Sequence, residues 1–500
     1  MPRTRPPRRS TQASGPEHEI MAARILVVDV GTSSVRASIV DTDGRIERDA
    51  SRETLPTSPA DGLVEFDATN IAAVAIDLAR TVAGDVTLDG VAICNQRASA
   101  VVWERATGTP IGPGIGWQDL RTIGHCFAAR EHGLRVAPNQ TATKLQWLID
   151  TFDPNRERDL LAGTVDAWIA WNLSRGTHHI TDATNAAVTG LALPTIDDWD
   201  AHALDALGIH ATLPTIVDSA GELGTAHALE GAPPIVAMVG DQQSSLVGQA
   251  CVVAGQAKIT FGTGGMLDQV VGPDPITRDR RSPNGTFPIV AWRVGGEVVW
   301  GLESIMLAAG TNVQWLRDGL GLIDEAAASH ELAASCNDTG GVVFVPAMMG
   351  LGTPQWDYGA RSGFFGLTRG TSRAQMVRAV LEGVAHRGAD LVDAAEADSG
   401  VHIGELRIDG GMSDNPTFVQ ALANATGRPV EIAAQREATT LGAGLLGGFA
   451  TGAFADFADI GTTWRPRARV EPTEPLDRDR WREASHRAGG WITALSGVDL

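Results

Sequence analysis

Residues 24–36 read RILVVDVGTSSVR, and this stretch guides the interpretation of the rest of the chain. An apolar run leads into Asp29, after which Gly31 and three hydroxylated residues precede a second run at residues 37–40. This pattern predicts a strand, a tight turn and a second strand.

The predicted turn has the chemistry of a phosphate site. Gly31 would let a ligand approach the backbone closely, while Thr32, Ser33 and Ser34 offer hydroxyl and amide donors to an anion. Asp29, at the end of the first strand, is placed to hold a hydrated Mg²⁺, which takes few protein carboxylates. An ordinary hairpin could contain the same residues, so the stretch alone leaves both interpretations open.

Composition narrows the class of protein. The 500 residues are 43% hydrophobic and include 57 glycines, which favours two domains over one core. A net charge of −20 argues against a nucleic acid or a membrane as partner, since either prefers a basic face. Four dispersed cysteines indicate neither a disulfide framework nor a zinc site, and no apolar run is long enough to span a membrane. We therefore expect a cytoplasmic protein.

The first 20 residues differ from the rest. They are rich in proline and arginine and lack the apolar segment of a signal peptide. We predict a disordered basic tail over residues 1–20, and the sequence leaves open whether translation starts at Met1 or Met21.

Polar side chains follow two further predicted strands. Asn95, Gln96 and Arg97 come after the apolar residues 86–93, and an indole follows at Trp117. Amide, guanidinium and indole groups together suit a polyhydroxylated ligand, although strand capping and a core tryptophan would use the same types. Asp241 follows the apolar residues 235–239, where a carboxylate could accept a proton from a ligand hydroxyl.

The second half of the chain echoes the first. Residues 256–265 read QAKITFGTGG, again a predicted strand that runs into a turn of glycine and threonine. The repeat suggests two related halves that each offer a phosphate-binding hairpin to one nucleotide.

These motifs, in this order, resemble the FGGY carbohydrate kinase family and, within it, the glycerol kinases. The resemblance rests on residues 95–97, 103, 108–110, 117–121, 142–147, 163–168 and 181–186, and extends from about residue 23 to about residue 455. It implies an α/β fold of two actin-like (ribonuclease H-like) domains with a nucleotide and substrate cleft between them. We expect an N-terminal domain at residues 21–252, with the substrate side and the catalytic base, and a C-terminal nucleotide-side domain at residues 253–500.

The resemblance also implies the activity and the site. It predicts an ATP-dependent polyol or sugar kinase that transfers the γ-phosphoryl group to a primary hydroxyl, with Asp241 as general base and Asp29 at Mg²⁺. The implied acceptor-binding residues are Arg97, Ala98, Trp117, Asn139, Asp241, Gln242 and Met266. The implied nucleotide-binding residues are Thr32, Ser33, Ser34, Arg36, Thr263, Gly310, Gln314, Gly411 and Asn415. Self-association is left open.

Three positions depart from the glycerol kinase pattern. Ala98 stands where those enzymes carry Glu, Asn139 where they carry Tyr, and Met266 where they carry Phe. A lost charged hydrogen bond costs roughly 1.5–3 kcal/mol, and the smaller side chains leave room for a longer molecule. The sequence therefore predicts a four- or five-carbon polyol or keto sugar as the preferred acceptor, with glycerol as the alternative.

Two other classes of protein compete with a kinase. A catalytically silent sensor of nucleotide and polyol would be expected to lack Asp241 or Asp29, and both are present. An actin- or chaperone-like ATPase shares the paired hairpins but has no use for residues 95–97 and Trp117. ADP release with and without polyols would separate the three.

Overall fold

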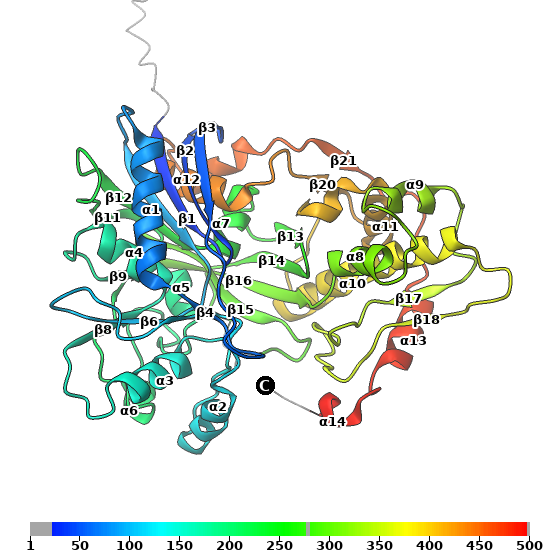
Figure 1. Cartoon of the computed structure of the whole chain (residues 1–500). Helices are drawn as coiled ribbons and strands as arrows, with labels where there is room; N and C mark the ends of the chain where they lie inside the picture. The colour runs from blue at the N-terminus through cyan, green and yellow to red at the C-terminus, as the bar shows by residue number, and fades with distance from the viewer. Residues whose placement is uncertain (1–22, 277–280, 498–500) are drawn as a thin grey trace, which may run out of the picture.

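A computed structural model describes residues 23–276 and 281–497, so the predicted tail at residues 1–20 lies outside the described part. The chain forms two lobes, the N-terminal one in blue to green and the C-terminal one in green to red (Figure 1). Their strands join in one continuous sheet of order β21-β20-β19-β13-β14-β16-β15-β11-β12-β5-β1-β2-β3.

The N-terminal half of the sheet has three antiparallel strands followed by two parallel ones. Its order is β3-β2-β1-β5-β12, in which β1 pairs antiparallel with β2 and parallel with β5, and β5 pairs parallel with β12. The strands are β1 (Arg24–Val30), β2 (Ser34–Asp41), β3 (Ile46–Glu53), β5 (Gly90–Asn95) and β12 (Pro234–Gly240).

The C-terminal half repeats this arrangement in the order β16-β14-β13-β19-β20. Its strands are β13 (Ala257–Phe261), β14 (Gly265–Gly272), β16 (Glu297–Met306), β19 (Leu406–Asp409) and β20 (Val430–Ile432). β11 (Ala220–Thr225) and β15 (Phe287–Val294) join the two halves. The shared order confirms the two related halves and the α/β class predicted from the paired hairpins.

The first strand is apolar on both faces because both faces are covered. Leu26 and Val28 pack in a core with α1 (Ala68–Ala83) and α4 (Val165–Leu173), whereas Ile25 and Val27 pack with Leu441 of α12 (Ala438–Ala450). Strands buried on two sides lose the usual alternation of polar and apolar residues.

Helices α1 and α10 follow their sequence signals. Asp67 caps α1 by accepting a hydrogen bond from the backbone N–H of Asn70 at 2.9 Å. Ser372 and Gln375 form a capping box before α10 (Arg373–Ser399). The sequence of α10 carries an apolar stripe, which is buried at Val377, Val380, Leu381 and Val384 and packs beside α8 (Gly310–Asp318) and α11 (Pro416–Thr426) in the C-terminal core.

The remaining helices and strands lie outside the elements described so far. They are β4 (Glu65–Phe66), β6 (Val101–Glu104), β7 (Gly114–Ile115), α2 (Ile123–Ala129), α3 (Ala142–Phe152), β8 (Leu160–Gly163), β9 (Ile180–Asp182), α5 (Ala183–Ala187), α6 (Ala201–Ala206), β10 (Thr215–Val217), α9 (Ala328–Ala334), β17 (Val343–Val345), β18 (Gly363–Phe365), β21 (Ala468–Val470), α13 (Arg478–Ala488) and α14 (Thr493–Ser496). The amphipathic pattern of residues 480–495 predicts a single C-terminal helix, but this prediction is wrong, because Gly489 and Gly490 separate α13 from α14. Within residues 23–276 and 281–497, no helix has the length and apolarity to cross a membrane.

Two helices cross between the lobes with their backbones almost touching. These are α7 (Asp241–Gly248), which follows β12, and α12, which follows β20 but packs on the N-terminal half of the sheet. A Cβ atom on Gly442 would lie 1.7 Å from the carbonyl oxygen of Ser244, and one on Gly248 would lie 1.9 Å from that of Ala438. The small residues of α12 therefore allow the two helices to pack closely.

We predict that Gly442→Ala destabilises the protein by at least about 3 kcal/mol, because the added methyl group would collide with backbone and not with a flexible side chain. Gly124→Ala in α2 is the matched control, since its Cβ would meet nothing within 4 Å. Urea unfolding of both variants measures the difference. Equal stabilities would show that the helices separate without penalty.

Candidate active site

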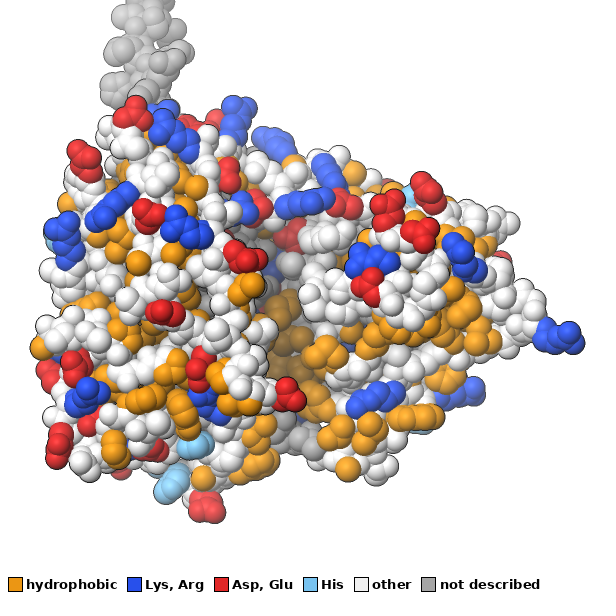
Figure 2. Space-filling view, viewed as in Figure 1, with side chains coloured by type: hydrophobic (Ala, Val, Ile, Leu, Met, Phe, Trp, Pro, Cys, Tyr) orange, Lys and Arg blue, Asp and Glu red, His pale blue; other side chains and the backbone are white. Residues whose placement is uncertain are grey.

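Three strand ends meet where the two lobes face each other. Val30 and Gly240 both pair with Asn95, so the carboxyl ends of β1, β5 and β12 lie at one edge of the sheet. Asp29 and Asp241 come from this edge, which is the usual ligand side of an open α/β sheet. Figure 2 shows a groove between the lobes.

Asp241 is the first residue of α7. Its carboxylate accepts a hydrogen bond from the backbone N–H of Gln242 at 2.8 Å, and its Oδ1 lies 3.4 Å from Nε of Arg97. Burial raises the pKa of Asp241 and the Arg97 charge opposes that rise. The side chain keeps 30% of its surface exposed, so a ligand can reach it.

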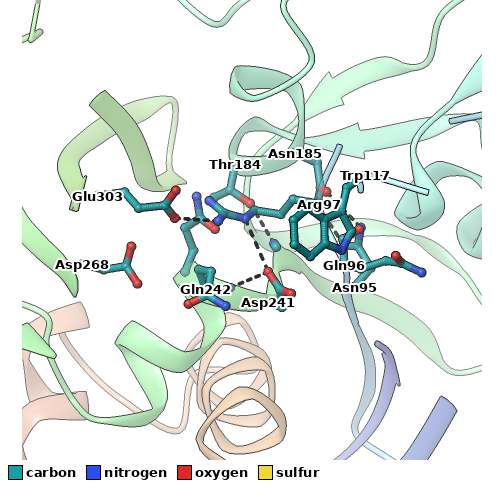
Figure 3. Close-up of polar contacts among 12 residues, drawn as sticks. Asn95, Gln96, Arg97, Trp117, Thr184, Asn185, Asp241, Gln242, Asp268 and Glu303 are labelled. Carbon is teal, nitrogen blue, oxygen red and sulfur yellow. Dashed lines mark hydrogen bonds and ion pairs between the residues drawn. The ribbon is translucent and has the colours of Figure 1, made fainter. Parts of the chain in front are cut away.

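Arg97 lies between two carboxylates from different lobes (Figure 3). Its Nη2 donates to Oε2 of Glu303 at 2.6 Å, opposite its contact with Asp241. Burial disfavours the guanidinium charge, but Glu303 and Asp241 outweigh burial and raise the pKa of Arg97. Its Nη1 is buried and has no hydrogen-bond partner within the described residues, so one donor remains for a ligand.

Glu303 is a site residue that the sequence analysis missed. It is the one acidic residue in the interior of β16, between Leu302 and Ser304. A buried carboxylate in an otherwise apolar strand is a signal for a paired charge, but its partner lies 206 residues away in the chain.

Trp117 contacts the turn that follows β1. Its indole N–H donates to Oγ1 of Thr32 at 3.1 Å, and its backbone N–H donates to Oγ of Ser99 at 3.1 Å. The turn itself is closed by a hydrogen bond from Gly31 N to Ser34 O at 3.0 Å, as the sequence pattern predicts.

Ala98 adopts a left-handed backbone conformation, with φ of 59°. Its carbonyl oxygen accepts a hydrogen bond from Nζ of Lys144 at 3.0 Å. Burial lowers the pKa of Lys144 to about 7, and the nearby Asp119 charge opposes that shift only in part. The hydrogen bond from Lys144 therefore holds the left-handed backbone of Ala98 in place.

A buried polar network supports the strand ends. Asn95 and Asn185 exchange side-chain hydrogen bonds at 2.9 and 3.0 Å. Thr184 accepts from the backbone N–H of Gly240 at 2.9 Å and donates to Asp182 at 2.9 Å. The network therefore holds Gly240, the residue before Asp241, from residues 182–185.

Among the residues predicted to bind the nucleotide, Gly310 and Thr263 lie close together and Asn415 has a structural role. The N–H of Gly310 donates to Gly262 O at 2.9 Å, and that of Ala309 donates to Thr263 O at 2.8 Å. Asn415 caps α11 through Phe418 N and donates to Ser329 at 2.9 Å, so both ends of its amide have protein partners.

The ligand contacts of four other predicted site residues are not tested by their positions in the structure. Arg36 pairs with Glu437 at 3.1 Å, and its phosphate contact stays a prediction. Gln314, Gly411 and Asn139 are exposed on α8, after β19 and before α3, and their ligand contacts also stay predictions.

Met266 lies on β14 two residues before Asp268, so both side chains share one face of the strand.

Asp29 has the environment of a cation ligand. Burial and the negative charge of Asp241 raise its pKa to about 7, while a 3.2 Å hydrogen bond from Thr440 lowers it only in part. Two carboxylates that disfavour each other's ionisation suit a dication between them. Within the described residues no three acidic, histidine or cysteine side chains gather at one point, so such an ion would draw on water and phosphate oxygens.

Two repeated ribonuclease H-like halves, a strand-end carboxylate and a charged cleft between the halves define a phosphotransferase of the actin-like fold. The family model of the FGGY carbohydrate kinase N-terminal domain matches residues 24–248, and that of the C-terminal domain matches residues 257–451. The chain belongs to the FGGY family of carbohydrate kinases. It is accordingly an ATP-dependent kinase that acts on an alcohol group, and the silent-sensor alternative is not favoured.

Similar proteins support the assignment over nearly the full length. A glycerol kinase of Aromatoleum aromaticum is 42% identical over 94% of this chain and 99% of its own. One of Koribacter versatilis is 40% identical over 94% of this chain and 99% of its own. The crystal structure of Plasmodium falciparum glycerol kinase with ADP superposes with a TM-score of 0.85 at 27% identity, covering 96% of this chain and 99% of that one.

We predict that Asp29→Asn raises the Tm of the ligand-free protein at pH 8 and that the gain shrinks as the pH falls to 5. The raised pKa means that Asp29 favours the folded state when protonated and loses that contribution as pH rises through about 7. Each kcal/mol shifts Tm by about 2–4 °C in domains of this size.

Asp67→Asn is the control, because asparagine caps a helix as well as aspartate does. Calorimetry at both pH values measures the shifts. A drop in Tm at pH 8 for Asp29→Asn alone would contradict the raised pKa and favour a stabilising turn aspartate.

Proposed function

We propose that Asp241 is the general base of the kinase and that Arg97 and Gln242 bind the acceptor beside it. Asp241 would take the proton of a primary hydroxyl as that oxygen attacks the γ-phosphorus of ATP and ADP leaves. The observation that carries the proposal is the partly exposed Asp241 carboxylate, held by Arg97 at 3.4 Å at the junction of both lobes.

We also propose the residues that handle the phosphates. Hydroxyl and backbone N–H groups are suitable donors to phosphate oxygens, and we propose that those of Thr32, Ser33, Ser34 and Thr263 act in this way. The guanidinium group of Arg36 would add positive charge. Asp29 would hold Mg²⁺ through water, and the ion would offset the phosphate charges. Gly310, Gln314, Gly411 and Asn415 are proposed to border the nucleotide.

Closure of the groove would protect ATP from water. We keep the division between residues 252 and 253 as the proposed domain boundary, which falls between the two family-model matches. Movement of the lobes about this boundary would expel water before transfer. The four cysteines are free thiols, which supports a reducing compartment such as the cytoplasm.

The acceptor is proposed to be a small polyol or keto sugar of four or five carbons. Because the similar proteins are named glycerol kinases, glycerol is the compound with which other acceptors should be compared. Ala98, Asn139 and Met266 support a longer molecule, because a carboxylate and two aromatic rings of the glycerol kinase pattern are replaced by smaller groups.

We predict that Asp241→Asn lowers kcat by about 10²–10⁴-fold while ATP binding and folding persist, because the amide keeps the shape and loses the base. Asp200→Asn, a helix cap of α6 remote from the site, is the matched control. Steady-state kinetics and calorimetric ATP titration give the result. A kcat within about threefold of the parent would exclude Asp241 as base.

We predict that a four- or five-carbon acceptor exceeds glycerol in kcat/KM when glycerol, erythritol, threitol, xylitol, ribitol and xylulose are compared. Ala98→Glu should shift the preference toward glycerol by restoring the acidic group. If glycerol leads the panel by about tenfold, the pocket is that of a glycerol kinase proper.

A further inference from the structure

A row of charged residues crosses the C-terminal half of the sheet next to the acceptor site. Lys258 of β13 pairs directly with Asp268 of β14, which pairs directly with Glu303 of β16. The side chains of Lys258 and Asp268 have no exposed surface, and that of Glu303 keeps 10%. The resemblance to a kinase gives no role to Lys258 or Asp268.

This row is an unfavourable arrangement for stability alone. Two carboxylates stand directly opposite each other on neighbouring strands, which is destabilising. Each has one cationic partner, Lys258 at 2.8 Å from Asp268 and Arg97 at 2.6 Å from Glu303. Apolar residues of similar volume are often as stable or more stable in place of such a buried pair.

Lys258 connects the row to Gln242. Its Nζ donates to Oε1 of Gln242 at 2.9 Å and to Oγ1 of Thr260 at 3.1 Å, and it lies 2.8 Å from Asp268. An ammonium group has three donors and no acceptor. The atom of Gln242 that faces Lys258 must therefore be its oxygen, and chemistry fixes the orientation of the amide.

The opposite end of the Gln242 amide is left for a ligand. Its Nε2 has no hydrogen-bond partner within residues 23–276 and 281–497, and Gln242 adjoins Asp241 at the start of α7 (Figure 3). Gln242 belongs to the helix that follows the N-terminal strands, whereas Lys258 lies on the first strand of the C-terminal half. The contact thus ties an acceptor-side residue of one lobe to the sheet of the other.

We propose that Lys258, neutralised by Asp268, is a positioning residue that turns the Gln242 amide so that its NH₂ group donates to an oxygen of the acceptor. The proposal rests on the acceptor-binding role of Gln242 proposed above. Gln242 and the free Nη1 of Arg97 then act as donors beside the accepting carboxylate of Asp241. The acceptor must offer oxygen lone pairs to both donors and its reacting hydroxyl to Asp241.

The test compares four proteins by acceptor kinetics: the parent, Gln242→Ala, the pair variant Lys258→Met with Asp268→Leu, and the pair variant with Gln242→Ala added. Lys258→Met alone would leave Asp268 buried without a cation and could prevent folding, whereas the pair variant removes both charges together. Arg428→Met with Glu396→Gln removes a 2.6 Å ion pair remote from the site and is the matched control.

We expect Gln242→Ala to raise the acceptor KM by about 2- to 12-fold and the pair variant to raise it by a similar factor, with kcat little changed. Adding Gln242→Ala to the pair variant should then change KM by less than about twofold, because the released amide no longer presents its donor. The control should keep the parent's KM.

Two results would count against the inference and are distinguishable. If Gln242→Ala raises KM by the same factor with and without Lys258, the lysine does not position the amide. If Gln242→Ala leaves the parent's KM unchanged, the proposed acceptor role of Gln242 itself fails.

Discussion

The close crossing of α7 and α12 is the constraint on which the rest of the structure depends. Gly248 and Gly442 bring the two helix backbones into direct contact, and Ser244 Oγ donates to Thr439 O at 2.6 Å across the crossing. Each helix follows the last parallel strand of one half and packs toward the other half. The crossing therefore sets where Asp241, at the start of α7, stands relative to Asp29, which Thr440 of α12 contacts.

The active site concentrates charges that folding alone would avoid. Asp29, Asp241, Asp268 and Glu303 are four carboxylates against the cations Arg97 and Lys258. Burial, together with the negative charge of Asp241, raises the pKa of Asp29, and this setting suits a dication, which a nucleotide phosphate would bring with it. Such sites lower the stability of the fold. They are retained because charges that are already in position stabilise the transition state without rearranging during the reaction.

Local patterns in the sequence predicted the two hairpins, the repeated halves and the strand ends that carry Arg97 and Asp241. Glu303 and Lys258 escaped prediction because their meaning depends on cross-strand register and on partners in the other lobe, which one sequence does not reveal. Asn415 caps α11, a structural role that the sequence pattern did not indicate, and its contact with the nucleotide stays a prediction. The packing of α12 on the opposite half is likewise a property of topology and not of local pattern.

The central claim is that acceptor, phosphates and metal meet at the junction formed by β1, β12 and α7. A crystal structure with ADP, Mg²⁺ and the best polyol of the panel tests it most directly. We predict a primary hydroxyl oxygen within about 3 Å of the Asp241 carboxylate and the ion on the Asp29 side of the phosphates. A polyol bound away from Asp241, or phosphates remote from the two Gly/Thr turns, would contradict the claim.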